Sequence, residues 1–293
     1  MTPSVAVVIP AYNAARFIRD SLESAFNQTI GAPDQVIVVD DGSEDGTTDV
    51  VRQFGPRVTL LNQRNGGAAA ARNAGAAVAR TEWLAFLDAD DRWCPAKLEK
   101  QLARVNAGGD FVYSDRRNIG QLDGLPAIQS VAQPMFDGRV FKQLLIENVI
   151  TTSSVLIRRQ LFEQVGGFSN DPRLPPAEDW DLWLRCADLV PIHLVSEPLV
   201  EYRLHGMGAS RNARRMNRAR RLILDRALRL GSARSLAPSE IRHVRSQVWS
   251  TNGWDAGRNG LLADALWWYA RAIAYEPFTK APYTGLLRAL LRR

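Results

Sequence analysis

Three acidic side chains follow a short apolar run in the first third of the chain. The run Trp83–Leu87 ends in Asp88, Asp90 and Asp91, which places three carboxylates within four positions. Carboxylates this close repel one another unless a positive group lies between them, and Mg²⁺ and Mn²⁺ prefer such hard oxygen ligands. The pattern predicts a divalent metal site that holds a phosphorylated ligand. A solvated turn after a buried strand is the simpler alternative for these residues taken alone.

Two other apolar runs also end in polar residues. The run Val5–Ile9 leads into Pro10-Ala11-Tyr12-Asn13, and Val36–Val39 leads into Asp40-Asp41-Gly42-Ser43. A tyrosine ring can stack on a planar base, and an aspartate can accept a hydrogen bond from a ring N–H, which favours uracil or thymine. A plain turn would explain the second cluster by itself, but three such clusters together predict a nucleotide site.

The clusters meet only if their strands are parallel neighbours in one sheet. Strand patterns alternate with helix patterns over the first hundred residues, with strands expected at 5–9, 36–39, 58–61 and 83–87. This alternation predicts an α/β fold with a doubly wound, mostly parallel sheet flanked by helices. In such sheets the ligand binds outside the carboxyl ends of the strands.

The pattern changes further along the chain. We expect a strand at 111–113, a loop-rich segment at 115–133 of the kind that often covers a site, a strand at 153–157, and two more at 192–195 and 199–204. Arginine-rich helices without a strand pattern follow. We therefore predict a domain over residues 1–210 and a basic, all-helical C-terminal extension over residues 211–293.

A paired acid opens one of the expected helices, after Pro175-Pro176. Glu178 and Asp179 would lie in its first turn, where acids stabilise the helix dipole by about 0.3–1 kcal/mol. Trp180, Trp183, Leu184 and Ala187 have the spacing of a buried stripe. On this helix Asp179 would lie at the flank of the stripe, facing a cleft, and Glu178 would point away.

The charge of the chain is unevenly distributed. Residues 211–293 hold 17 Lys and Arg against five Asp and Glu, whereas residues 1–210 are net acidic. The tail's charge fits an anionic lipid surface, nucleic acid or simply water. We expect Leu222-Ile223-Leu224 and 286–293 to be amphipathic pieces suited to a membrane surface. Two distant cysteines, Cys94 and Cys186, and the lack of a long apolar run predict a cytoplasmic protein, with peripheral contact at the inner face of the membrane as one option.

Taken in order, these motifs resemble the family 2 inverting glycosyltransferases, whose fold is the nucleotide-sugar-binding type called GT-A. The resemblance runs from Ile9–Asn13 through Val38–Ser43, Asn65–Gly67 and Leu87–Asp91, and extends over Gly166–Phe168, Glu178–Trp180 and Tyr202–His205. It covers about residues 4–210. The combination is specific, although no single motif is.

The resemblance implies a role for each matching residue. Pro10, Tyr12, Asn13, Asp41 and Gly42 would form the nucleoside pocket, with Asp41 reading the base. The donor's pyrophosphate and sugar would contact Arg72, Asp88 and Asp91. The metal ligand would be Asp90. His205 would contact the donor phosphate or the metal. Asp179 would be the general base, supported by Glu178.

The implied reaction moves a sugar from a UDP- or dTDP-sugar donor to a hydroxyl of a polysaccharide, glycolipid or other glycan, with Mg²⁺ or Mn²⁺ as cofactor. Which of Asp90 and Asp91 is the main metal ligand stays open. A nucleotidyltransferase on a related fold is the rival enzyme, but the first strand is not followed by a Gly-rich phosphate loop. A non-catalytic nucleotide-sugar-binding adaptor is the rival outside enzymes. Nucleic-acid binding would rest on charge alone.

Overall fold

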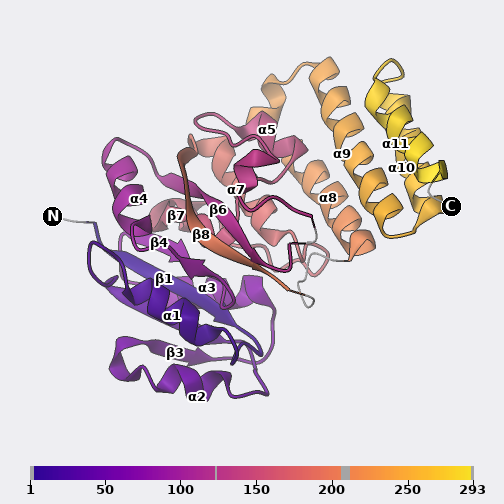
Figure 1. Ribbon diagram of the computed structural model, residues 1–293. Helices are drawn as coiled ribbons and strands as arrows, with labels where there is room; N and C mark the ends of the chain where they lie inside the picture. Colours follow the sequence, from indigo (N-terminus) through magenta and orange to yellow (C-terminus); the bar gives the residue numbers. More distant parts are fainter. Residues whose placement is uncertain (1–2, 123, 206–211, 292–293) are drawn as a thin grey trace. The chain divides into compact units, whose positions relative to one another are not determined.

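The computed structural model describes residues 3–122, 124–205 and 212–291 (Figure 1). Contacts divide the chain into two compact units. The first contains the chain up to Val140, Val149–Asn170 and the strand that follows Leu189; the second contains Phe141–Asn148, Asp171–Asp188 and the C-terminal helices. The predicted boundary at residue 210 lies outside the described residues. The division into 1–210 and 211–293 stays a prediction, and two short segments of the predicted first domain group with the C-terminal helices.

The first unit is built on one mixed sheet of eight strands in the order β3-β2-β1-β4-β7-β6-β8-β5. The strands are β1 (Val5–Ala11), β2 (Gln35–Asp40), β3 (Thr59–Asn62), β4 (Trp83–Phe86), β5 (Arg92–Trp93), β6 (Phe111–Gly120), β7 (Leu156–Arg158) and β8 (His193–Leu204). The four strands β3-β2-β1-β4 are parallel, as are β6 and β8. Strand β7 runs antiparallel to both of its neighbours, and β5 runs antiparallel to β8. The predicted α/β fold with helices around a largely parallel sheet is confirmed.

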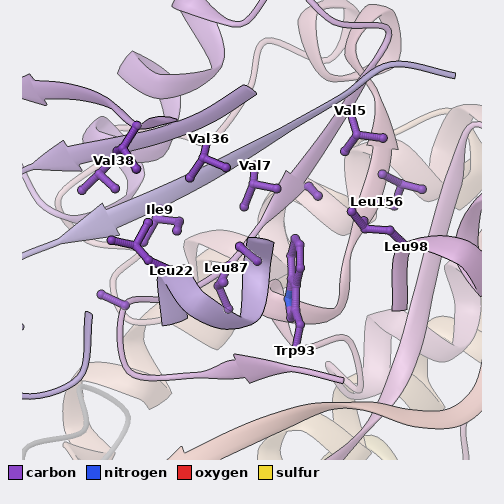
Figure 2. Close-up of a cluster of buried hydrophobic side chains, with 14 of the residues drawn as sticks. Val5, Val7, Ile9, Leu22, Val36, Val38, Leu87, Trp93, Leu98 and Leu156 are labelled. Carbon is purple, nitrogen blue, oxygen red and sulfur yellow. The ribbon is translucent and has the colours of Figure 1, made fainter. Parts of the chain in front are cut away.

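Alternate residues of the central strands face opposite layers of helices. Val5, Val7 and Ile9 of β1 are buried in one cluster with residues of α1 (Ile18–Phe26), α2 (Thr47–Arg52) and α4 (Lys97–Asn106). Figure 2 shows part of this cluster, with Leu22, Leu87, Trp93 and Leu98 beside the strand residues. Because side chains alternate along a strand, Val8 points to the other face. There α3 (Ala68–Val78) and α6 (Arg159–Gln164) cover the sheet.

Helix α3 packs unusually close to the sheet, and one glycine makes this possible. A Cβ atom built on Gly75 would lie 2.4 Å from Val8 Cγ1 and 3.2 Å from Val39 Cγ2. No side chain fits there without moving the strands. The small residues of this Ala-rich helix therefore set the distance between α3 and the strands whose ends carry the polar clusters.

Three predicted elements differ from those observed. The segments 192–195 and 199–204 are one strand, β8, and its pairing with β6 shifts register around Asp115. Strand β6 continues to Gly120 because β8 offers it a partner along its whole length, so the predicted loop at 115–133 begins as a strand. The predicted strand 153–157 is the 3₁₀ turn η3 (Thr152–Ser154) followed by the three-residue β7. Two other 3₁₀ turns are η1 (Gly55–Arg57) and η2 (Gln129–Val131).

The second unit is helical in its described residues. Its elements are α5 (Phe141–Ile146), α7 (Glu178–Leu189), α8 (Ala213–Ala227), η5 (Ser232–Ser235), α9 (Pro238–Arg258), α10 (Leu262–Tyr275) and α11 (Lys280–Leu291). The predicted helical character of the C-terminal segment is confirmed. Among the described residues, no helix is both long and apolar enough to cross a bilayer.

One predicted amphipathic piece is not available at the surface. Ile223 and Leu224 of α8 are each 2% exposed. The segment Leu222–Leu224 therefore cannot present an apolar face to a membrane.

Candidate active site

The predicted polar clusters lie along one edge of the sheet in the first unit. Strands β2, β1 and β4 are parallel neighbours, so Asp40–Ser43, Pro10–Asn13 and Asp88–Asp91 follow their carboxyl ends side by side. The end of β8 joins them, because His205 Nε2 lies 2.8 Å from Asp90 Oδ2. Four strand ends thus lie along this edge. The loop Asp88–Asp91 at the end of β4 is hereafter called the acid loop.

Asp90 is the acid of this loop that meets His205. Its side chain is 36% exposed, and the His205 side chain is 23% exposed. The imidazole stacks on Phe17, with ring centroids 5.5 Å apart. Its second nitrogen, Nδ1, is buried and has no hydrogen-bond partner among the described residues. The pair therefore offers a carboxylate and an imidazole that are fixed in place and partly open to a ligand.

Asp91 has a different environment. It is fully buried, and both of its oxygens accept hydrogen bonds, Oδ1 from Arg203 N at 2.9 Å and Oδ2 from Ser153 Oγ at 2.6 Å. These bonds hold the acid loop to β8 and to η3. The geometry thus favours a structural role for Asp91 and leaves Asp90 as the acid suited to an incoming cation.

The surroundings of the acid loop disfavour the ionised form of two of its carboxyl groups, those of Asp90 and Asp91. Burial, and then the charge of Asp88, raise the pKa of Asp90 above its ordinary value, while the hydrogen bond to His205 opposes the rise. Burial also raises the pKa of Asp91 well above its ordinary value, with added repulsion from Asp90 and Asp88. A cation beside Asp90 would relieve this accumulation of negative charge.

The donor set fits a divalent cation that is shared with a ligand. Among the described residues, no three side chains of His, Cys, Asp or Glu gather as a complete metal cage. Mg²⁺ is commonly held by one or two carboxylates together with substrate phosphates and water. Asp90, with its partner His205, meets this requirement, and phosphate oxygens would supply the remaining ligands.

Arg72 and Asp88 form an ion pair next to this centre. Arg72 Nη2 lies 2.6 Å from Asp88 Oδ1, and the Arg72 side chain is 7% exposed. Its guanidinium also lies over the Phe168 ring, 5.2 Å from the centroid. The sequence predicted separate contacts of these two residues with the donor. The structure brings them together, so that Arg72 orients the Asp88 carboxylate.

The ends of β1 and β2 are tied to each other by hydrogen bonds. Asn13, with φ of 49°, donates from its backbone to Ser43 Oγ at 2.9 Å, and its Oδ1 accepts from Glu44 N. Asn13 thus ties the end of β1 to the segment that follows β2. Tyr12 is 53% exposed at this edge, free to stack on a planar group, and Pro10 precedes it on β1.

Asp41 holds the loop that precedes α3. Its oxygens accept from Gln63 Nε2 at 2.7 Å and from the backbone N–H groups of Gly66 and Gly67 at 2.8 Å each. A carboxylate has about four acceptor positions, of which three are used here, and Asp41 is 3% exposed. Gly42 next to it has φ of 79°, and a Cβ there would lie 3.2 Å from Asn65 N.

Glu178 and Asp179 lie in the second unit, at the first turn of α7 as predicted. Asn148 Nδ2 donates to Asp179 Oδ2 at 3.2 Å, and Trp180 N donates to Asp179 Oδ1 at 2.7 Å. Asp179 is half-buried. Glu178 is also buried, at 8% exposed, because α7 is buried on nearly all sides.

Two residues that were not predicted from the sequence, Ser153 and Arg203, organise the acid loop. Ser153 donates to Asp91 and accepts from Asp88 N at 3.0 Å. Arg203 donates from its backbone to Asp91 and from Nε to Asp90 O at 2.9 Å. In the sequence, the feature that marks Ser153 is the polar run Thr151–Ser154, which lies between Ile150 and Val155. All four residues of this run are buried.

Comparison with known proteins assigns the chain to a family. The model of glycosyl transferase family 2 matches residues 6–166. The chain belongs to this family. Among curated proteins it is similar to the putative teichuronic acid biosynthesis glycosyltransferase TuaG of Bacillus subtilis (strain 168), at 32% identity over 217 residues, 72% of this chain and 82% of TuaG. The chain spans only 35% of the length of two other curated relatives that it matches.

Solved structures confirm the GT-A type of fold. The chain is similar to TarS (residues 1–349) from S. aureus in complex with UDP-GlcNAc, with a TM-score of 0.69, 17% identity, and coverage of 98% of this chain and 89% of that one. It is also similar to the mannosyltransferase PcManGT from Pyrobaculum calidifontis in complex with GDP-Man and Mn²⁺. There the TM-score is 0.64 at 22% identity, with coverage of 100% of this chain and 82% of that one.

Proposed function

We propose that this chain is an inverting glycosyltransferase that moves a sugar from a UDP- or dTDP-sugar to an acceptor hydroxyl. The observation that carries the proposal is the contact between Asp90 and His205 at an edge where two other strand ends, those of β1 and β2, carry the side chains predicted to bind a nucleotide. Family membership and the fold shared with proteins solved in complex with UDP-GlcNAc or GDP-Man support a nucleotide-sugar donor.

The donor would lie along the carboxyl edge of the sheet. Tyr12 would stack on the base, and the free acceptor position of Asp41 would receive a ring N–H, which uracil and thymine offer. The ion pair between Asp88 and Arg72 would face the ribose, the sugar hydroxyls and the diphosphate. Asp91, buried and fully hydrogen-bonded, would fix the acid loop without touching the donor.

Asp90 and His205 would hold Mg²⁺ or Mn²⁺. A metal cofactor is supported by the fold shared with PcManGT, which was solved in complex with Mn²⁺. When bound, the cation would neutralise charge that develops on the leaving diphosphate. Because the leaving group is then already stabilised, no protein acid is required to protonate it. Arg72 would add a fixed positive charge at the same place.

Asp179 would act as the general base. Its carboxylate would take the proton of the acceptor hydroxyl as the oxygen attacks the anomeric carbon on the side opposite the diphosphate. This single displacement inverts the anomeric configuration, with a transition state of oxocarbenium character. Asn148 and Trp180 N, which donate to the Asp179 carboxylate, would keep it oriented.

The acceptor would be a cell-surface polysaccharide, a glycolipid or another glycan. The name of the relative TuaG points to polysaccharide synthesis. Peripheral contact of the basic C-terminal helices with the inner face of the membrane is part of the proposal, since lipid-linked acceptors are found there.

The experiment that tests the function is a donor screen that measures release of the nucleoside diphosphate. UDP- and dTDP-sugars, with GDP-mannose as a comparison, would be incubated with Mn²⁺ and mixed glycan acceptors, and product configuration read by ¹H NMR. We expect release from a UDP- or dTDP-sugar and an inverted product. Binding of donors without turnover of any of them would favour the adaptor. A retained configuration would contradict the proposed mechanism.

A further inference from the structure

Exposed apolar side chains gather at the C-terminal end of the described chain. Among the described residues, those between 278 and 291 include five of the thirteen large hydrophobic residues that are exposed. They are Phe278, Tyr283, Leu287, Leu290 and Leu291. Phe278, which precedes α11, is 98% exposed.

Helix α11 has two apolar faces, and its own unit covers only one of them. On the inner face Pro282 is buried, and Leu286 and Ala289 pack against the cluster of Ala256, Ala265 and Tyr269. The contact is close, because a Cβ on Gly285 would lie 2.4 Å from the Tyr269 ring. The inner face is therefore fixed to α9 and α10, which lie beside α11 in the same unit (Figure 1).

The outer face consists of Tyr283, Leu287, Leu290 and Leu291, which follow one another at the spacing i, i+4, i+7 and i+8. This is the spacing of a continuous stripe along one side of a helix. With Phe278 it forms what we call the outer stripe. Leucine and phenylalanine side chains in this number are rarely left in water along one stripe unless they meet a partner.

The charge of this segment selects the partner. Residues 277–293 contain four basic residues, Lys280, Arg288, Arg292 and Arg293, and no acidic residue. Two copies meeting through this segment would bring like charges together without any acid to pair them. A cationic helix with an apolar side matches the boundary of an anionic lipid surface, where the apolar side chains enter the acyl region and the basic ones meet headgroups.

We propose that the outer stripe of α11 is the face by which this protein binds a membrane surface rich in anionic lipid. The proposed function includes a membrane contact, and the outer stripe is the surface that would make it. This assignment does not depend on sugar transfer. It also replaces the predicted segment Leu222–Leu224, which is buried, with a different surface. The predicted segment that begins at Leu286 is retained in part, through Leu287, Leu290 and Leu291.

The test is co-sedimentation of the full chain with vesicles of phosphatidylcholine alone or mixed with phosphatidylglycerol. The double variant Phe278→Ser/Leu287→Ser removes part of the stripe, and Arg288→Glu reverses one charge. The control, Val131→Ser, changes an apolar residue of the first unit whose exposure (76%) lies between those of Phe278 (98%) and Leu287 (56%). Circular dichroism and thermal unfolding verify that each variant folds.

We expect wild type and Val131→Ser to bind mixed vesicles and to bind phosphatidylcholine much more weakly. The double variant should lose about tenfold or more in affinity, given the area its two side chains bury. Arg288→Glu should weaken binding to mixed vesicles, and added salt should weaken it further by screening.

Three results would overturn the inference. Equal binding by the double variant would show that the stripe is not the binding face, and absence of binding by folded wild type would exclude a lipid partner. A dimer in sedimentation equilibrium that the double variant converts to monomer would show that a second copy covers the stripe. Since none of these readouts uses catalysis, a failed donor screen would leave this result unaffected.

Discussion

The Ser153 hydroxyl donates to Asp91 Oδ2 at 2.6 Å, and both residues are fully buried. The same hydroxyl accepts the backbone N–H of Asp88 at 3.0 Å. One side chain from η3 thus fixes both ends of the acid loop, and Asp90 lies between the two fixed points. The position of Asp90 relative to His205 depends on this arrangement.

Ser153→Ala should therefore impair donor binding as well as stability. Loss of the hydroxyl leaves Asp88 N and Asp91 with one partner fewer, which costs about 1–2 kcal/mol of unfolding free energy. Supporting residues around a metal typically change its affinity 10- to 100-fold, and we expect about tenfold weaker Mn²⁺-dependent nucleotide binding. Calorimetry and urea unfolding measure the two effects.

Ser154→Ala is the matched control for this variant. Ser154 is equally buried, and its hydroxyl donates to Thr151 O at 2.7 Å rather than to the acid loop. It should lose similar stability while nucleotide binding stays at the wild-type value. If both variants bind the nucleotide as wild type does, Ser153 has no positioning role.

Asp90 and Asp91 should differ in how they affect stability. Asp91→Ala leaves the buried Ser153 hydroxyl and Arg203 N without their acceptor, so we expect a loss of about 2–4 kcal/mol in unfolding free energy. Asp90→Ala removes a repulsive charge from a partly exposed position, so stability should stay the same or rise. Chemical denaturation of both variants in metal-free buffer measures this difference. The reverse order would mean that Asp91 is not the structural acid.

Asp179→Asn should greatly slow turnover without affecting donor binding. An amide cannot accept the acceptor's proton, and general-base catalysis contributes about 10²–10⁴-fold. We expect kcat to fall by a factor of about 10²–10⁴, with nucleotide affinity unchanged. Asp188→Asn, at the other end of α7, is the control, since the Asp188 carboxylate accepts from Gly231 N and Ser232 N. An Asp179→Asn enzyme with near wild-type kcat would exclude Asp179 as the base.

A buried lysine predicts a pH dependence of stability. Lys97 is fully buried, its Nζ donates to Gln101 Oε1 at 2.7 Å, and it lies 4.0 Å from the Trp93 ring centroid. Burial lowers the pKa of Lys97 well below the ordinary value of 10.5. The unfolded chain therefore binds the proton more tightly than the folded one. Unfolding free energy should rise with pH between the lowered pKa and 10.5, by at most about 1.4 kcal/mol per pH unit.

Lys97→Met should remove this slope and stabilise the protein at neutral pH. The thioether side chain fills a similar volume and carries no charge to desolvate. Lys100→Met is the control, because Lys100 is partly exposed and pairs with Glu197 on the surface. Unfolding curves at several alkaline and neutral pH values measure the slopes. An unchanged slope in Lys97→Met would mean that Lys97 is not responsible.

The parts of the site that could be predicted are those carried by strand ends. Buried parallel strands have an apolar pattern that is readable locally, and the residues that follow them must share one edge. This reasoning placed Tyr12, Asp41 and Asp90 correctly along the sheet. It also found the first turn of α7 from the prolines and acids that precede it.

The parts that could not be predicted depend on contacts between distant residues. Nothing local distinguishes Asp90 from Asp91; the difference comes from Ser153 and Arg203, 62 and 112 positions away from Asp91. The same holds for Glu178 and for Ile223, whose burial is decided by neighbouring helices. Strand β8 was divided in two because Glu197 and Pro198 interrupt its apolar pattern, whereas pairing with β6 carries it through that point.

The central claim is that Asp90, with His205, holds a metal that binds the donor diphosphate. Calorimetric titration with UDP, dTDP and GDP, in Mn²⁺ and again in EDTA, tests it most directly on wild type, Asp90→Ala and the exposed control Asp49→Ala. We expect Mn²⁺-dependent binding of UDP or dTDP in wild type and in Asp49→Ala, and its loss in Asp90→Ala. Absence of nucleotide binding by folded wild type, or equal binding in EDTA and in Asp90→Ala, would contradict the claim.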